Sequence, residues 1–336
     1  MSEDLEPLAP EAGVDLYLDH RRGEVSEETL SSHRYRLEQF IDWCEDQEIH
    51  NLNELTGRDL HSYRVHRREA DDLKPVTLQG QLSTLRVFLE FCASVDAVEE
   101  RLREKILLPT VSDENQASKT TLEAKHAERI LEYLETYQYA SRHHVLMTLL
   151  WRTGLRMGSA RAIDLEDYDA DSPGVQLVHR PEQDTPLKNK ERGERWVALR
   201  PHTATVIDEY ISGPRKDITD EFSREPLLTT AQGRVSRSCI QGAVYTLTRP
   251  CEYGECPHDD YDPATCRATK RAYASKCPSS RSPHDVRSGA ITAHLLDDVP
   301  IEVVSGRMDV TQSVLDKHYD RRSEREKMEQ RREYLK

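Results

Sequence analysis

The sequence predicts a mainly α-helical protein with a small antiparallel β-sheet, an α+β fold divided between two domains. Apolar residues recur at helical spacing over most of the chain, as they do on the buried face of an amphipathic helix. Residues 175–179 and 196–199 instead have the composition of β-strands, and a polar, lysine-bearing segment connects them. Periodicity is lost over residues 105–121, where Ser, Asp and Asn accumulate. We interpret this segment as a linker between the two domains.

The first domain, residues 13–104, is predicted to be all-helical, and an acidic, disordered tail at residues 1–12 precedes it. Ser26 is placed to begin one of its helices. Two apolar stripes at helical spacing are interpreted as its core, including two cysteines that we expect to be buried. The stripes consist of Leu30, Leu37, Phe40, Ile41 and Cys44, and of Leu78, Leu82, Leu85, Leu89 and Cys92.

The second domain, residues 122–336, begins with helical patterns around residues 130–134 and 145–150, the latter apolar on all sides and therefore buried. Helical patterns return at residues 206–211 and 240–247 and from His284 onward, with an exposed charged helix at the end of the chain. A cysteine-rich segment, residues 250–280, has the character of an insertion.

Composition limits the classes of function. No apolar run approaches the roughly 20 residues that span a bilayer, and the acidic N-terminus lacks a signal-peptide pattern, so a cytoplasmic protein is expected. The formal net charge is −14, but net charge does not exclude a local basic groove. Basic residues cluster at 64–68, 188–195 and 321–332. One hypothesis is a halophile's surface, rich in carboxylates; the alternative is an ordinary acidic cytosolic enzyme.

The most informative stretch is residues 282–319. His284 and Arg287 lie three residues apart, so at the start of a helix their side chains point the same way. A helix N-terminus also offers free N–H groups to an anion, and the matching partner is a phosphate. Tyr319, a candidate nucleophile, follows about thirty residues later. Arg156 comes abruptly after an apolar helix, and Lys188 lies between the two predicted strands.

In this order, these residues resemble the tyrosine recombinase, or phage integrase, family, in a Xer-like branch similar to integrases of halophilic archaea. The resemblance covers nearly the whole chain. It implies an N-terminal helical core-binding domain followed by a catalytic domain. The matching stretches are Thr153-Gly154-Leu155-Arg156, Thr185-Pro186-Leu187-Lys188, His284-Asp285-Val286-Arg287, Ser305-Gly306-Arg307 and His318-Tyr319-Asp320.

The resemblance implies cleavage and rejoining of double-stranded DNA through a 3′-phosphotyrosyl link, with neither ATP nor a catalytic metal, by a homotetramer on paired sites. Two arginines, Arg156 and Arg287, can bind the non-bridging oxygens of a phosphate bidentately. Tyr319 would attack the phosphorus and His284 would transfer a proton near neutral pH. The remaining implied roles are protonation of the 5′ oxygen by Lys188, a hydrogen bond to the phosphate from Arg307 and a DNA contact by Lys190.

The sequence departs from the family pattern at several positions. Arg307 stands where the family has its second histidine, and it cannot act as a base. The interval from Arg307 to Tyr319 is longer than usual, which leaves Tyr334 as an alternative nucleophile. Ser159 stands where many relatives carry a carboxylate, and Lys190 competes with Lys188 for the role of the strand-hairpin lysine.

Four of the seven cysteines cluster in the insertion: Cys251, Cys256, Cys266 and Cys277, with His258 nearby. In a cytosolic protein such a cluster favours zinc over disulfides, and a structural zinc could fold a segment that is poor in apolar residues. The alternative is free thiols in a polar loop.

The leading hypothesis is therefore a site-specific DNA strand-transfer enzyme that holds duplex DNA between its two domains. In this hypothesis Arg64, Arg67 and Arg68 form a basic patch that contacts DNA phosphates. The alternatives are a non-catalytic DNA-binding protein on the same scaffold, a type IB topoisomerase-like enzyme, and a zinc-organised interaction protein.

Overall fold

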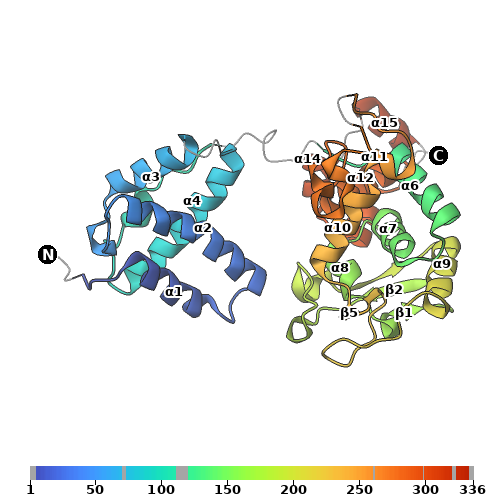
Figure 1. Ribbon diagram of the computed structural model, residues 1–336, viewed down its shortest axis with the longest axis horizontal. Helices are drawn as coiled ribbons and strands as arrows, with labels where there is room; N and C mark the ends of the chain where they lie inside the picture. Colours follow the sequence, from blue (N-terminus) through green and yellow to red (C-terminus); the bar gives the residue numbers. More distant parts are fainter. Residues whose placement is uncertain are drawn as a thin grey trace. The chain divides into compact units, whose positions relative to one another are not determined.

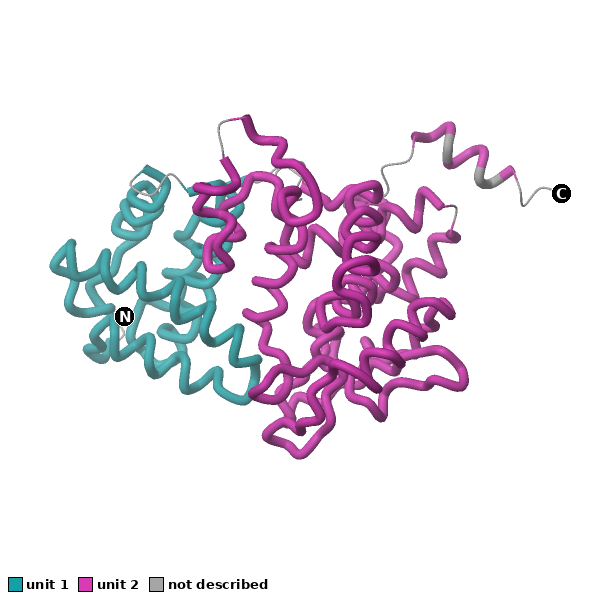
Figure 2. Tube along the Cα trace, turned by 45° about the vertical axis from the view of Figure 1, so that its right-hand side comes forward, with its two compact units in different colours: residues 1–117 teal, residues 118–336 magenta. Residues whose placement is uncertain are grey.

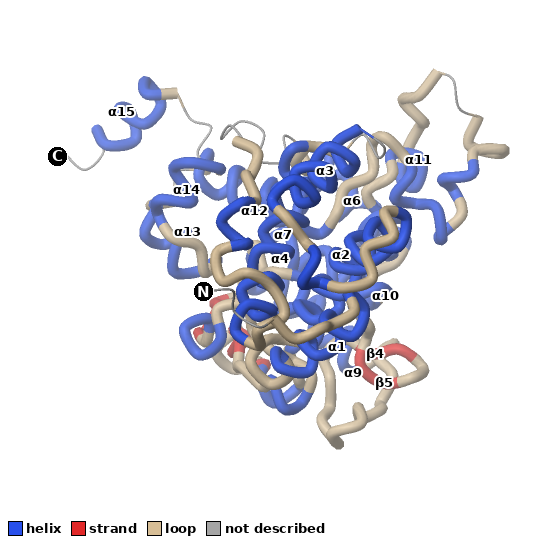
Figure 3. Tube along the Cα trace, turned by 90° about the vertical axis from the view of Figure 1, so that its left-hand side faces the viewer, coloured by secondary structure: helices blue, strands red, loops and turns tan. Residues whose placement is uncertain are grey.

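The computed structural model describes residues 5–69, 73–110, 120–259, 262–297, 299–319 and 323–332 of the 336-residue chain. The chain forms two compact units, residues 1–117 and 118–336 (Figure 2). Helices dominate both units, and the strands that the structure describes belong to the second (Figure 3). The prediction of a mainly α-helical protein with small antiparallel sheets is thus confirmed.

The first unit is a helical bundle (Figure 1). Ser26 begins its second helix as predicted, because the Ser26 side chain accepts a hydrogen bond from the Thr29 N–H. Both predicted stripes are in the core, and the thiols of Cys44 and Cys92 are buried, which raises the pKa of each to about 12. The helices are α1 (Pro10–Arg21), α2 (Glu27–Asp46), α3 (Gly57–Glu69) and α4 (Pro75–Ser94), with 3₁₀ turns η1 (Leu52–Glu54) and η2 (Leu102–Lys105).

The predicted disordered tail is wrong for residues 5–12. Helix α1 begins at Pro10, where proline favours a helix start. Before it, the Leu8 N–H donates to Asn51 Oδ1 at 3.2 Å and the Glu6 N–H donates to the Asp96 carbonyl at 2.9 Å. Leu8 also packs against the core of this unit. These contacts fix a segment whose acidic composition alone indicated disorder; residues 1–4 lie outside the described residues.

The second unit is built around α7 (Arg142–Thr153), which is buried along almost its whole length, as its apolar sequence predicts. Helices α6 (Ala124–Tyr137), α9 (Pro201–Ser212), α10 (Arg237–Leu247) and α12 (Pro283–Leu296) all contact it. The other helices are α8 (Met157–Ala162), α11 (Pro250–Tyr253), α13 (Ile301–Met308), α14 (Gln312–His318) and α15 (Glu324–Arg332).

A three-stranded antiparallel sheet of order β1-β2-β3 lies beside these helices (Figure 1). The two predicted strands are present as β2 (Gly174–Leu177) and β3 (Arg195–Ala198), paired so that Val175 is opposite Val197. The additional strands are β1 (Tyr168–Asp169) and the hairpin β4 (Thr229–Thr230) and β5 (Gly233–Arg234). The 3₁₀ turns are η3 (Leu165–Asp167), η4 (Pro181–Gln183), η5 (Lys190–Gly193), η6 (Arg267–Thr269) and η7 (Arg271–Lys276).

The lengths and hydropathy of the helices show whether any of them could span a membrane. Over the described residues, every helix is too short or too polar to cross a bilayer.

Candidate active site

Arg156 is positioned by the end of the central helix. Helix α7 ends at Gly154, whose φ of 63° is in the left-handed region that favours glycine. The chain turns there and Arg156 becomes the N-cap of α8. The Arg156 guanidinium forms an ion pair with the Asp309 carboxylate through Nη1 and donates from Nη2 to the Asp309 carbonyl at 2.8 Å. Arg156 is thus held in place from 153 residues away in sequence.

Arg287 lies on the first turns of α12. Ser282 and Asp285 form a capping box at the start of this helix, which fixes its direction. The Arg287 guanidinium donates from Nη1 to the Gly154 carbonyl at 2.6 Å and from Nη2 to the Met308 carbonyl at 2.7 Å. Burial lowers the pKa of Arg287, the charge of Arg156 lowers it further, and the charges of Tyr319 and Asp309 oppose this change. The two arginines therefore share one electrostatic environment.

His284 is in the same electrostatic environment as these arginines and Lys188. Desolvation lowers the pKa of His284 although the residue remains exposed, Asp285 opposes the shift, and the positive charges of Arg287, Lys188 and Arg156 add to it. His284 is therefore neutral at physiological pH and able to accept a proton. Lys188 is exposed in the connection between β2 and β3, as the sequence predicted.

Three polar residues that the sequence analysis missed complete this cluster. Asn189 donates from Nδ2 to Asp309 Oδ1 at 2.8 Å, and Arg195 Nη1 lies 4.0 Å from Asp309 Oδ2. Burial lowers the pKa of Arg195, and Asp309 opposes this shift. Arg195 also donates from Nε to the Arg307 carbonyl at 2.9 Å. We call Arg156, Lys188, Arg195, His284, Arg287 and Asp309 the arginine cluster.

Arg307 directs its guanidinium to the main chain. It donates from Nη1 to the Ala198 carbonyl at 2.8 Å and from Nη2 to the Arg152 carbonyl at 3.3 Å. Burial lowers its pKa, and the charge of Arg200 adds to this effect. In this structure Arg307 ties the end of α13 to β3 and α7.

Tyr319 is the C-cap of α14 and is half-buried. Its N–H donates to the Leu315 carbonyl at 2.9 Å, and its ring packs on a small apolar cluster that includes Ile291 and Met308. The Tyr319 carbonyl accepts a hydrogen bond from Thr292 Oγ1 at 3.4 Å, so the end of α14 lies beside α12, the helix that carries Arg287. The charge of Tyr319 also raises the pKa of Arg287. The alternative nucleophile, Tyr334, lies outside the described residues.

Comparison with known proteins assigns the family. Residues 14–94 match the model described as phage integrase, N-terminal SAM-like domain. The tyrosine recombinase XerC of Staphylococcus haemolyticus is 29% identical over 191 residues, covering 55% of this chain and 58% of that protein. XerC of Pseudomonas fluorescens is 27% identical over 207 residues, covering 59% and 67%. The chain belongs to the tyrosine recombinase/integrase family.

A solved structure supports the fold of this recombinase/integrase family member. The Tn1549 transposon integrase, in complex with a circular intermediate DNA, is similar with a TM-score of 0.68 and 15% identity, covering 97% of this chain and 99% of that one. The chain spans only part of the XerC relatives above, just over half of the first and about two thirds of the second. The comparisons thus show the fold and the family.

Ser159 and Lys190 are two further positions at which the sequence bears on the family pattern. Ser159, where many relatives carry a carboxylate, is buried on α8. Lys190 is exposed and begins the η5 turn with a φ of 52°. It lies two residues beyond Lys188, whose charge lowers the pKa of His284.

The predicted basic patch of the first unit is wrong in one of its three residues. Arg67 is buried on α3 and donates from Nε to Gln81 Oε1 at 3.1 Å, a contact that ties α3 to α4. Arg68 is exposed and pairs with Glu69 at 2.7 Å, and Arg64 is half-buried. Only Arg64 and Arg68 remain candidates for contact with phosphates, because Arg67 faces the interior of its unit.

The cysteine-rich insertion contains α11, η6 and η7. Its four clustered thiols are half-buried and free, and Cys277 Sγ lies 3.8 Å from His258 Nε2. Burial raises the pKa of Cys251, Arg249 opposes this, and the nearby Cys277 and Cys256 add to it. In the part of the chain that the structure describes, no three His, Cys, Asp or Glu side chains are arranged to hold a metal ion. The described geometry therefore pairs Cys277 with His258 and does not itself form a zinc cage.

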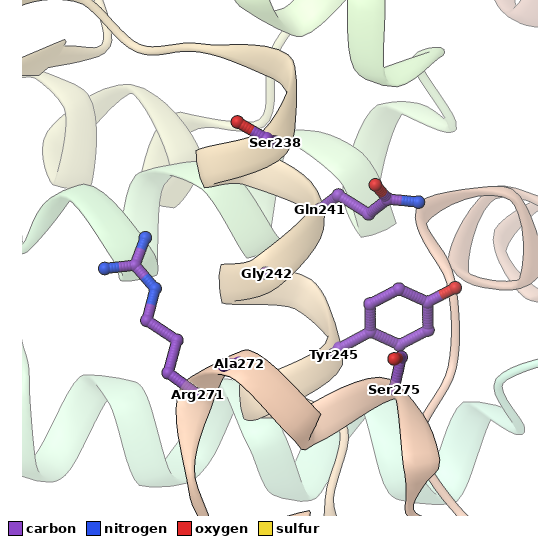
Figure 4. Close-up of a pocket in the computed structure, with 7 residues that line it drawn as sticks. All are labelled: Ser238, Gln241, Gly242, Tyr245, Arg271, Ala272 and Ser275. Carbon is purple, nitrogen blue, oxygen red and sulfur yellow. The ribbon is translucent and has the colours of Figure 1, made fainter.

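An open pocket of about 620 Å³ lies between α10 and the η7 turn of the insertion. Gln241 and Tyr245 from α10 and Arg271 from η7 line it, as Figure 4 shows. The guanidinium of Arg271 donates from Nη2 to Cys239 Sγ at 3.2 Å. Residues 266–281 carry five Lys and Arg side chains and no Asp or Glu. The pocket is therefore polar and lies on a locally basic segment of an acidic chain; its other lining residues are Ser238, Gly242, Ala272 and Ser275.

Proposed function

We propose that this chain is a site-specific recombinase that cleaves and rejoins double-stranded DNA through a phosphotyrosyl intermediate. The observation that carries the proposal is that Arg156 and Arg287 donate to the adjacent carbonyls of Asp309 and Met308, while the Tyr319 carbonyl contacts Thr292 on the helix of Arg287. A phosphodiester resists attack because negative charge accumulates on its oxygens, and preorganised guanidinium groups stabilise that charge. The arginine cluster supplies such groups, and Tyr319 ends the helix that follows Asp309.

In the proposed reaction, the Tyr319 oxygen attacks the scissile phosphorus, and the bond from phosphorus to the 5′ oxygen breaks. The phenol proton passes to His284, whose lowered pKa leaves it neutral and able to accept a proton. Lys188, whose charge acts on His284, gives a proton to the departing 5′ oxygen. The 3′-phosphotyrosyl link retains the energy of the phosphodiester, so a 5′ hydroxyl from another strand can reverse the step. The proposed chemistry uses neither ATP nor a metal ion.

Duplex DNA is the proposed partner, and a homotetramer the proposed assembly on paired sites, because exchange between two duplexes requires four strand cleavages. Arg64 and Arg68 of the first unit and Lys190 of the second are proposed to contact phosphates. We also propose that the pocket between α10 and η7 contacts the duplex, since amide, hydroxyl and guanidinium groups match base edges and phosphates.

A covalent-capture experiment tests this function. The chain is incubated with a pool of nicked duplexes of random sequence, and DNA that remains attached to protein in SDS is sequenced. We expect adducts with wild type and a loss of adduct in Tyr319→Phe. Tyr137→Phe removes an exposed tyrosine hydroxyl from α6 and should leave adduct formation unchanged. Adducts that persist in Tyr319→Phe would exclude this residue as the nucleophile.

The same experiment separates the alternatives. Binding of DNA without any adduct would indicate a non-catalytic DNA-binding protein, and adducts without sequence preference, together with relaxation of supercoiled plasmid, would indicate a topoisomerase. If the chain neither binds nor cleaves DNA, the remaining alternative is a zinc-organised interaction protein.

A structural zinc bound by Cys251, Cys256, Cys266 and Cys277 is proposed separately. Elemental analysis tests it. Cys251→Ser and Cys277→Ser should lose bound zinc, and Cys239→Ser, outside these four, should keep it.

A further inference from the structure

Asp309 is the common anion of the arginine cluster. Its carboxylate pairs with Arg156 Nη1, accepts from Asn189 Nδ2 at 2.8 Å and lies 4.0 Å from Arg195 Nη1. Its charge also raises the pKa of Arg287, against the effect of burial. One carboxylate therefore lies within 4.0 Å of two guanidinium groups from different segments of the second unit, and its charge also acts on a third.

The chemistry of this position is that of a phosphate-binding site. A carboxylate and a phosphate offer the same hydrogen-bonding acceptors to a guanidinium, in the same bidentate geometry. The Asp309 side chain is 16% exposed and that of Arg156 is 25% exposed, so solvent reaches the pair. The N–H groups that Asp309 now accepts from are those that a phosphate at this position would need. The two anions cannot occupy the position together, because they would repel each other at close range.

The backbone at Asp309 adds a link to the nucleophile. Asp309 ends α13 with a φ of 51°, in the left-handed region that Asp and Asn tolerate better than most residues. The segment that follows it forms α14 and ends at Tyr319. A change at Asp309 therefore acts on the chain that carries the phenol oxygen.

We propose that Asp309 occupies the phosphate position of the arginine cluster, keeps the guanidinium groups in place and neutralised, and is displaced when a DNA phosphate binds. The inference rests on the proposed function and adds a positioning residue to it. A free anion must compete with the Asp309 carboxylate for the guanidinium groups and therefore binds weakly. A DNA phosphate is also held by the rest of the DNA-binding surface, so the cluster favours DNA over free anions.

Binding of inorganic phosphate to the full chain tests the proposal without requiring cleavage. Asp309→Asn keeps the shape and the tolerance of a positive φ and removes the charge. We expect its phosphate affinity, measured from the shift of the thermal unfolding midpoint with phosphate concentration, to rise on the order of tenfold or more above wild type. The control is Asp220→Asn, which removes a carboxylate that pairs with Arg234 at 2.7 Å, outside the arginine cluster, and should leave phosphate affinity unchanged.

A purely structural role for Asp309 predicts a different result. Asp309→Asn would then lower the unfolding midpoint without strengthening phosphate binding, and that outcome overturns the proposal. If Asp309→Asn does not fold, Asn189→Ala replaces it: removal of the amide that holds Asp309 Oδ1 should strengthen phosphate binding by several-fold, and an unchanged affinity overturns the proposal. If Asp309→Asn binds phosphate more tightly but the wild type forms no DNA adduct, the role of Asp309 is supported and the recombinase chemistry is rejected.

Discussion

Arg287 donates a 2.6 Å hydrogen bond to the carbonyl oxygen of Gly154, which lies 133 residues earlier in the chain. A second donor of the same guanidinium binds the Met308 carbonyl at 2.7 Å. Arg287 thus joins the end of α7 to the end of α13, and in doing so it sets the distance between Arg156 and Asp309. A residue that we propose to bind phosphate is at the same time a structural bridge.

Arg287→Lys is expected to weaken the second unit. Lysine carries a point charge and cannot present the planar fork that reaches both carbonyls, so one buried acceptor loses its partner at a cost of about 1–3 kcal/mol in the free energy of unfolding. Urea titration measures this change, and the capture assay should lose the adduct. Arg192→Lys, on an exposed arginine of η5, should stay within about 0.5 kcal/mol of wild type. Equal losses in both variants would contradict the bridging role.

Two glycines near the candidate site should respond to alanine in opposite directions. Gly154 has a φ of 63°, and a Cβ there would lie 2.7 Å from the Met308 sulfur. Gly154→Ala should therefore lower the free energy of unfolding by about 1–2 kcal/mol from the backbone alone. Gly306 lies inside α13 with open space around its Cα, so Gly306→Ala should raise it by up to about 1 kcal/mol. Urea titration of both variants checks the signs, and a stabilised Gly154→Ala would show that this turn tolerates a side chain.

The sequence was sufficient to predict the local positions of some residues of the candidate site. His284 and Arg287 share a helix face, and Gly154 followed by Arg156 marks the end of an apolar helix, so both could be predicted. Asn189 and Asp309 meet only because the β2–β3 connection folds onto the end of α13, a long-range contact that no local pattern encodes. Arg67 was misplaced because α3 is polar on most of its surface, and periodicity could not show which side faces α4.

Stability should fall when the pH drops from 7.5 to 5. His144 is buried on α7, and its Nδ1 accepts the Ala140 N–H at 3.3 Å, which requires an unprotonated nitrogen. Burial lowers its pKa, Glu135 opposes the shift and His202 adds to it. Below about pH 6.5 the unfolded chain therefore binds a proton that the folded chain does not. The free energy of unfolding decreases from that pH downward, until the folded histidine also titrates.

His144→Asn should reduce this pH dependence, since its amide oxygen can accept the Ala140 N–H and does not titrate. Urea titrations at pH 7.5, 6.5 and 5.5 measure the slope. His126→Asn, on an exposed histidine of α6, is the matched control. A reduction of the same size in both variants would show that the effect does not come from the buried imidazole.

Arg271 should contribute more to DNA binding than the other basic residues of its segment. Its side chain lines the pocket on α10 together with Gln241 and Tyr245 (Figure 4), whereas Lys276 is exposed on the same turn and outside that lining. Arg271→Ala and Lys276→Ala each remove one positive charge from η7, so a general electrostatic contribution is common to both. The difference between them isolates the pocket.

We expect Arg271→Ala to lose about 1–3 kcal/mol of binding free energy toward duplexes selected by the wild type, and Lys276→Ala to lose less. Sequencing of duplexes selected by each variant from a random pool distinguishes the kind of contact. Relaxed preference at one or two positions in Arg271→Ala indicates a base contact, because a phosphate contact weakens binding uniformly across sequences. Equal losses in affinity and unchanged preferences in the two variants would contradict a role for the pocket, and would assign the contribution of this segment to its charge alone.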